Sequence, residues 1–109
     1  MPKRDPQLLI QDISEAGTKI LQFTTGFTFE TFIKDERTID AVVRNFEIMG
    51  EASKRPPEEF KAQHPQVEWR EMTNFRNLLI HEYFGINYEI VWSVTQDYLP
   101  RNLRLIKEI

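Results

Sequence analysis

Cysteine is absent from this chain of 109 residues. Disulfide bridges and thiolate metal sites are therefore excluded, and a reducing cytoplasm is the simplest location for the protein. The chain also lacks an apolar run long enough to span a membrane, and no apolar signal core follows its first few residues. These absences favour a folded cytoplasmic protein with no membrane association.

An excess of basic residues is missing as well, since 14 lysines and arginines stand against 17 aspartates and glutamates, for a net charge of −3. Tight, sequence-blind binding to nucleic acid needs a basic surface, so the overall charge argues against it but leaves room for a local basic pocket. The length predicts a single domain over residues 1–109. Its core would be modest, and pairing with a second copy would add apolar burial.

Hydrophobic residues recur at steps of three and four along most of the chain, as Leu9, Ile13, Ala16 and Ile20 do near its start. This period is typical of helices with one buried face, and no stretch alternates for long enough to indicate a strand. The pattern predicts an all-α protein, an up-and-down bundle of about five helices. The expected ranges are 6–23, 28–34, 37–54, 69–84 and 87–105, with a brief helical piece at 58–63 and a kink or break at Pro100.

The segment 75–85 carries the reactive side chains that stand out most. It places Arg76, Asn77, His81 and Tyr83 within eight residues of an otherwise apolar helix. An arginine is always charged, a histidine titrates near neutrality and a tyrosine brings a phenol. Cleavage of a phosphodiester needs charge stabilisation and proton transfer of this kind. On composition alone, however, such a set is more often a solvated helix face with a phenol in the core.

The helical angles divide this segment into two faces. Arg76 and Tyr83 are seven residues apart and return to nearly the same side, whereas Asn77 and His81 share a neighbouring side. Arg76 and His81 diverge by about 140° on an ideal helix. The length of the arginine side chain could close part of that gap, and so could a partner helix that brings a second copy of the motif.

Other polar and aromatic residues have simpler interpretations. Glu47 and Glu51 are expected to form surface or interhelical ion pairs, and Glu51 is the likelier of the two to approach a site. His64 precedes a proline and is interpreted as a turn residue. Six aromatic residues could form a stacking set for nucleic acid, but their helical spacing favours the core. They are Trp69, Phe75, Phe84, Tyr88, Trp92 and Tyr98.

The motif Arg-x4-His-x-Tyr, present as residues 76–83, resembles the HepT-like toxins of the HEPN superfamily. Further stretches that look like landmarks of that family are 32–35, 41–45, 50–54 and 65–70, followed by Tyr83-Phe84-Gly85, Trp92 and Leu99-Pro100. The likeness covers nearly the whole chain. It implies a helical bundle that pairs as a homodimer, with the motif helices facing across the interface.

The resemblance also implies a function. The protein would be the toxin of a type II toxin–antitoxin pair, a ribonuclease that cleaves RNA without a metal or other cofactor. Its antitoxin would be a small nucleotidyltransferase. Arg76 and His81 inherit the catalytic roles, Asn77 and Glu51 are the expected supporting residues that position the substrate, and Tyr83 is the residue to which the antitoxin would attach AMP.

Two positions depart from the family pattern, and two other functions stay open. Glu82 stands where an aspartate commonly follows the motif histidine, and Asn87 stands where an aspartate is frequent after the motif glycine. Neither change removes a catalytic group. The first alternative is a non-catalytic helical dimer that binds a nucleotide or a partner protein, with Arg76 as a phosphate anchor. The acidic net charge favours this alternative mildly. The second is a purely structural helical dimer.

Overall fold

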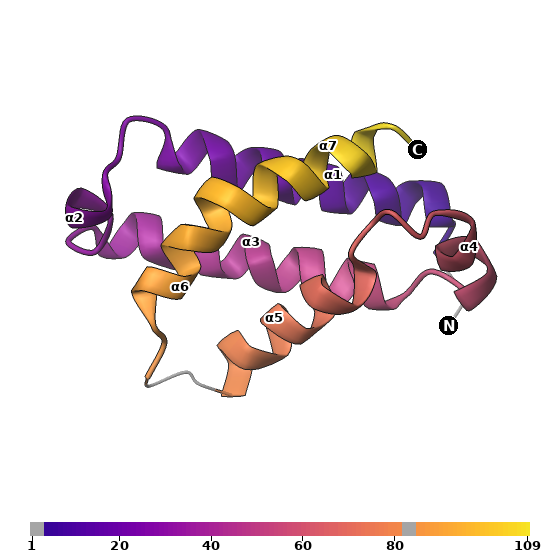
Figure 1. The fold of residues 1–109 in the computed structure, drawn as a ribbon. Helices are drawn as coiled ribbons and strands as arrows, with labels where there is room; N and C mark the ends of the chain where they lie inside the picture. Colours follow the sequence, from indigo (N-terminus) through magenta and orange to yellow (C-terminus); the bar gives the residue numbers. More distant parts are fainter. Residues whose placement is uncertain (1–3, 82–84) are drawn as a thin grey trace.

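The computed structural model describes residues 4–81 and 85–109, and every regular element in these residues is helical. The predicted all-α fold is therefore confirmed for the described part of the chain (Figure 1). The elements are α1 (Pro6–Thr24), α2 (Phe29–Phe32), α3 (Glu36–Lys54), α4 (Glu58–Gln63), α5 (Trp69–His81), α6 (Tyr88–Ser93), a π-helical turn η1 (Val94–Tyr98) and α7 (Leu99–Lys107).

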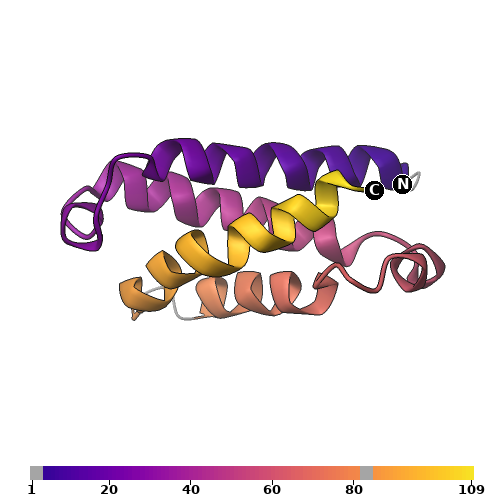
Figure 2. The same ribbon diagram turned by 45° about the horizontal axis from the view of Figure 1, so that its top comes forward.

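The three long helices lie side by side, with α3 between α1 and α5 (Figure 2). The chain reverses direction from α1 to α3, from α3 to α5 and again into the segment from α6 to α7, which is the predicted up-and-down arrangement (Figure 1). Helix α7 returns along α1. The buried core collects residues from every described element except α4 and includes Ile13, Ile20, Phe32, Val42, Leu99 and Ile106.

Side-chain caps explain why the first helices begin where they do. Asp5 accepts a hydrogen bond from the Gln7 amide, and Asp35 accepts one from the Thr38 amide. Each bond satisfies an amide group at a helix start that has no partner within the helix. The predicted starts and ends of α1, α3 and α4 agree with the structure to within one residue.

The last predicted helix is divided, but the break lies before Pro100 rather than at it. Pro100 is within the first turn of α7, where a missing amide hydrogen costs little. It cannot donate to the carbonyl group four residues earlier, and the turn that precedes it, Val94–Tyr98, widens into a π-helix. The range 87–105, which was expected to form one helix, is therefore occupied by three elements, α6, η1 and the greater part of α7.

The aromatic residues mostly pack in the core, as predicted. Trp69 is buried, and Phe75, Trp92 and Tyr98 pack against the core. The prediction was wrong for Tyr88, which is 41% exposed in the first turn of α6. Phe84 lies outside the described residues. None of the helices in residues 4–81 and 85–109 is long and apolar enough to cross a membrane.

Helix α5 is anchored to its neighbours from both sides. Phe75 packs edge-on against Phe46 of α3, with ring centroids 5.0 Å apart. At the start of α5, the buried Asn102 of α7 accepts a hydrogen bond from the Glu68 amide and donates to the Met72 sulfur, 3.0 Å away. These contacts fix the helix that carries the Arg-x4-His segment.

Candidate active site

The site begins at the crossing of α3 and α5, where Gly50 faces Arg76. A Cβ atom built on Gly50 would lie 2.1 Å from the Cβ of Arg76 and 2.8 Å from the carbonyl oxygen of Met72. The two helices therefore approach one another closely because position 50 has no side chain. The Thr73 hydroxyl lies within hydrogen-bond distance of the Gly50 carbonyl oxygen, at 3.4 Å, and of the Trp69 carbonyl oxygen, at 3.1 Å.

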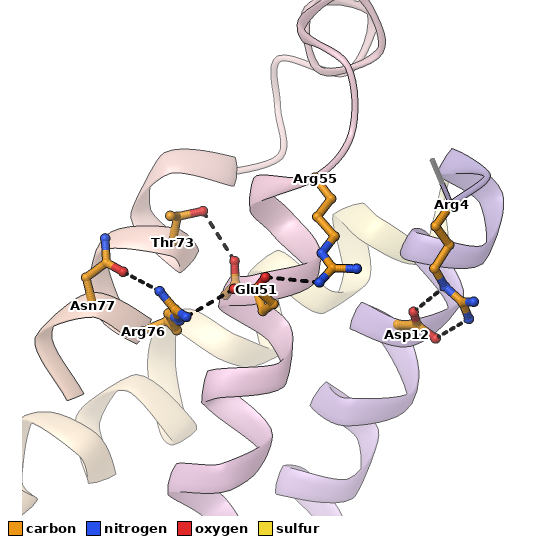
Figure 3. A network of polar contacts seen from close by, with 8 residues as sticks. Arg4, Asp12, Glu51, Arg55, Thr73, Arg76 and Asn77 are labelled. Carbon is orange, nitrogen blue, oxygen red and sulfur yellow. Dashed lines mark hydrogen bonds and ion pairs between the residues drawn. The ribbon is translucent and has the colours of Figure 1, made fainter. Parts of the chain in front are cut away.

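The guanidinium group of Arg76 is held at both of its terminal nitrogens. Its Nη2 lies 3.1 Å from Glu51 Oε2, and its Nη1 donates to Asn77 Oδ1 at 2.9 Å (Figure 3). A guanidinium group has five N–H donors, of which one donates to Asn77, so N–H groups remain that a phosphate could occupy beside the ion pair with Glu51. Glu51 thus contacts the arginine directly, which is a more specific role than the general supporting one expected from the sequence.

Glu51 is shared between two arginines. Its second carboxylate oxygen, Oε1, accepts a hydrogen bond from Arg55 Nη2 at 3.2 Å (Figure 3). The Glu51 side chain is 40% exposed, and ion pairs of this kind contribute about 0–1 kcal/mol to stability. The network therefore acts mainly on the geometry of the arginines. The prediction that Glu51 forms an interhelical ion pair is confirmed.

A cleft of about 350 Å³ opens beside this network. Its charged walls come from three helices and include three arginines and three carboxylates. Those residues are Asp12, Arg44, Glu47, Glu51, Arg55 and Arg76, and Ile48 and Ile80 add apolar surface. Asp12 is paired in turn with Arg4, whose Nε lies 2.9 Å from its Oδ2 (Figure 3). The cleft is a balanced set of charges in which an incoming phosphate would compete with carboxylates for the arginines.

His81 lies at the end of α5 and is exposed. It does not line the cleft, and within residues 4–81 and 85–109 it makes no hydrogen bond or ion pair with Arg76. The structure therefore brings together Arg76, Asn77 and Glu51, but it does not add His81 to them within the described chain. Tyr83, the expected AMP acceptor, lies outside the described residues.

Asn77 connects the two faces that the sequence separates. Neighbouring residues on a helix do not normally face each other, yet the long Arg76 side chain bends back so that its Nη1 reaches the Asn77 amide oxygen. Asn77 was expected on the His81 side of the helix.

Two residues of the network were not predicted from the sequence. Gly50 was included in the family landmark 50–54 without a role of its own, although a glycine inside a helical pattern often marks close packing. Arg55 directly follows the last residue of α3 and was assigned no role from the sequence. No local signal connects either residue with Arg76, because Gly50 and Arg76 are distant in sequence.

Comparison with known proteins places this geometry in a family. The model of the family described as Ribonuclease HepT-like matches residues 13–109. The chain belongs to the HepT-like ribonuclease family. A protein named as an RNase in Methanocaldococcus jannaschii is 45% identical to this HepT-like chain over 109 residues, which are 100% of this chain and 90% of that protein.

Two further relatives have similar names. One, from Thermococcus cleftensis, is named as a ribonuclease HepT and is 43% identical over 98 residues, or 90% of this chain and 89% of its own length. The other, from Caldanaerobacter subterraneus, is named as an RNase and is 38% identical over 106 residues, or 97% and 95% of the two chains. No solved structure matches. The predictions of the HepT-like family and of a ribonuclease are confirmed.

Proposed function

We propose that this protein is a metal-independent endoribonuclease and the toxin of a type II toxin–antitoxin pair. The observation that carries the catalytic part is the position of Arg76. Its guanidinium group is held between Glu51 and Asn77 at the wall of an open cleft, in a chain of the HepT-like ribonuclease family. The proposal includes a single domain over residues 1–109 and a cytoplasmic location.

In the proposed reaction, the ribose 2′-oxygen attacks the neighbouring phosphorus and the bond to the 5′-oxygen of the next nucleotide breaks. His81 takes the proton from the 2′-hydroxyl group as a general base, or gives one to the departing 5′-oxygen as a general acid. The remaining N–H groups of Arg76 stabilise the negative charge that develops on the phosphate oxygens. Asn77 and Glu51 keep the arginine in place. The products are a 2′,3′-cyclic phosphate and a 5′-hydroxyl group.

The proposed active form is a homodimer in which two α5 helices face each other. The exposed isoleucines on both sides of the cleft support this arrangement, since Ile48 is 37% and Ile80 is 43% exposed. A symmetric interface would place each of these side chains against the same patch of the partner. It would also bring His81 of one copy towards Arg76 of the other, which is why the divergence of the two residues on one helix is no obstacle.

Cleavage of a structured RNA by the wild type, Arg76→Ala and His81→Ala tests the catalytic proposal. We expect the loss of the histidine to slow cleavage by about 100- to 10,000-fold. The loss of the arginine should slow it by about 100- to 1,000-fold. His64→Ala is the matched control, because His64 lies in the connection after α4 and should not affect the rate. Growth arrest on expression should follow the same order.

Two results would contradict this reaction. The first is cleavage that survives both His81→Ala and a chelator. The second is activity of the wild type that chelator abolishes and added metal restores. Binding of RNA or AMP without any cleavage would instead favour the non-catalytic dimer, in which Arg76 is only a phosphate anchor. Analysis of the product ends for the cyclic phosphate separates this mechanism from hydrolysis by water.

We further propose that a nucleotidyltransferase antitoxin neutralises the protein by attaching AMP to Tyr83. The phenol oxygen would displace pyrophosphate from ATP and form a bond to the α-phosphorus. By the helical spacing of residues 76 and 83, the added phosphate would lie on the Arg76 face, about two turns away, and would repel the substrate phosphate. Mass spectrometry after incubation with the antitoxin and ATP should find one AMP on Tyr83. Finding it on the exposed Tyr88 would contradict the proposal, and Tyr88→Phe is the matched control.

A further inference from the structure

Gly50 lies directly under the stem of Arg76. A Cβ atom at position 50 would lie 2.1 Å from the Cβ of Arg76, 2.8 Å from its Cγ and 2.8 Å from the carbonyl oxygen of Met72. Non-bonded carbon atoms normally approach to about 3.5–4.0 Å. Because two of these neighbours are the backbone and the Cβ of α5, no rotamer change could make room. Any side chain at position 50 would displace α5 together with the arginine.

We propose that Gly50 is a positioning residue for Arg76 and that Gly50 and Glu51 together form a seat for this arginine on α3. Gly50 receives the stem of the side chain, while Glu51 holds Nη2 and Asn77 holds Nη1. Contacts at the stem and at the head define both the place and the direction of the guanidinium group. The inference rests on the proposed ribonuclease function, in which Arg76 is catalytic.

The second buried glycine shows that this arrangement is specific to α3 and α5. Gly17 lies where α1 meets α7, and a Cβ atom there would be 3.0 Å from Leu103 Cδ1 and 3.4 Å from Leu99 Cδ1. These neighbours are the ends of flexible leucine side chains, which can move by a few tenths of an ångström. Gly17 thus lies in a tight contact that flexible leucine side chains can relieve, whereas Gly50 lies against the backbone and the Cβ atom that carry Arg76.

The contacts orient the Arg76 guanidinium group without blocking its access to a phosphate. Glu51 gives only one oxygen to Arg76 and the other to Arg55. The remaining N–H groups of Arg76 leave room for a phosphate with two oxygens in contact. An ion pair that competed fully with the substrate would occupy both edges of the guanidinium group. Removal of Glu51 should therefore lower the rate of cleavage and not raise it.

The first test compares Gly50→Ala with Gly17→Ala. A displacement of about 1 Å can slow an enzyme by about 100-fold, so we expect kcat of Gly50→Ala to fall to that extent with KM changed only a few-fold. Gly17→Ala should keep the wild-type kcat. Nitrogen-15 NMR of labelled arginine gives a readout that does not depend on activity. The Arg76 guanidinium signals, identified by their loss in Arg76→Lys, should shift or average in Gly50→Ala and stay unchanged in Gly17→Ala.

Glu51→Gln provides a second test if Gly50→Ala does not fold, because the Glu51 side chain is partly exposed. It should release Nη2, change the Arg76 signals and lower kcat by about 10-fold, roughly the effect of 1.4 kcal/mol in the barrier. Glu68→Gln is the matched control, since Glu68 also pairs with an arginine, Arg101, at 3.7 Å. In an Arg76→Ala background, Glu51→Gln should cause no further loss, because it acts through the arginine.

Unchanged Arg76 signals and kcat in a folded Gly50→Ala protein would overturn the inference. An equal loss in Gly17→Ala would also do so, since it would show a general sensitivity of the helix crossings. So would a Glu51→Gln effect that persists without Arg76. Failure of the proposed function looks different. In that case the wild type cleaves no RNA, and the NMR comparison of the variants still decides whether Gly50 and Glu51 place the arginine.

Discussion

Arg76 packs against α3 with its guanidinium group between Glu51 and Asn77, whereas His81, five residues further along the same helix, is exposed to solvent. The Arg76 side chain is 27% exposed and contacts two residues, Glu51 of α3 and Asn77 of its own helix. The histidine has no hydrogen bond to any of these groups within the described residues. One chain therefore holds the Arg76 guanidinium group by two contacts and leaves His81 exposed outside them.

The contrast indicates how a small helical domain can hold a two-residue site. A helix can present residues five positions apart only on different faces, because each residue turns by about 100°. The side that faces α3 receives the arginine, and the side that faces solvent receives the histidine. In the proposed homodimer, a second copy of the helix, related by a two-fold axis, would supply the histidine that one copy does not bring to its own arginine. The predictions below test this contrast.

The largest effect is expected from mixing two inactive variants. Arg76→Ala and His81→Ala proteins, unfolded and refolded together, should regain about a quarter of wild-type activity, since half of the dimers are mixed and each of these has one intact site of two. If both residues act within one chain, the mixture stays inactive. Each variant refolded alone is the control. The measurement is the rate of RNA cleavage after refolding.

A charged side chain introduced beside the cleft should dissociate the proposed homodimer into monomers. Ile80→Glu would bury a carboxylate without a partner in the interface, and such a change weakens binding by about 2 kcal/mol or more. We expect a monomer by light scattering at concentrations at which the wild type is a dimer. Ile33→Glu, at an equally exposed isoleucine after α2, should remain a dimer. A dimeric Ile80→Glu protein would place the interface elsewhere.

A smaller effect is expected where α5 begins. Asn102 is 1% exposed and joins α7 to the Glu68 amide and the Met72 sulfur. Asn102→Ala would leave these buried groups without their partner, and the free energy of unfolding should fall by about 1–3 kcal/mol. Asn74→Ala, at an exposed position of α5, should change it by less than about 0.5 kcal/mol. Equal stability of both variants would show that this contact does not anchor the helix.

The smallest effect concerns stability at high pH. Burial, and then the neighbouring Glu68 and Glu71 carboxylates, raise the pKa of Tyr98 above its ordinary value of 10.0. The folded protein therefore keeps the phenol proton more tightly than the unfolded chain does, so this contribution to stability is complete below pH 10.0 and is lost as the pH rises further. Chemical unfolding between pH 9 and pH 11, roughly one unit on either side of the ordinary tyrosine pKa, measures this loss. The free energy of unfolding should decline less over this range for Tyr98→Phe than for the wild type. Parallel declines would contradict it.

Much of the fold could be predicted because its signals are local. The spacing of apolar residues indicated each long helix, and the expected bounds of α1 and α3 agree with the structure to within one residue. The sequence did not predict features that depend on contacts with other parts of the fold. The π-helical turn before Pro100 depends on how the chain relieves a missing hydrogen bond, and the exposure of Tyr88 depends on which face of α6 meets the core.

The candidate site divides in the same way. Arg76, Asn77 and His81 could be named from their chemistry and from one stretch of sequence, and Glu51 could be named as the glutamate nearer a site. Their contacts could not be derived. Gly50 carries no reactive group, and its effect on Arg76 appears only when two helices from different parts of the chain meet.

The sequence by itself determined the helices, the all-α class and the two faces of α5, because these follow from side chains a few residues apart on a regular helix. It also determined which reactive groups the chain has. Only the tertiary structure decided that Gly50 lies against the stem of Arg76 and that Glu51 holds its head. The physical reason is that close packing of two helices depends on the volume of each side chain at the crossing, and no local pattern specifies which residues will meet there.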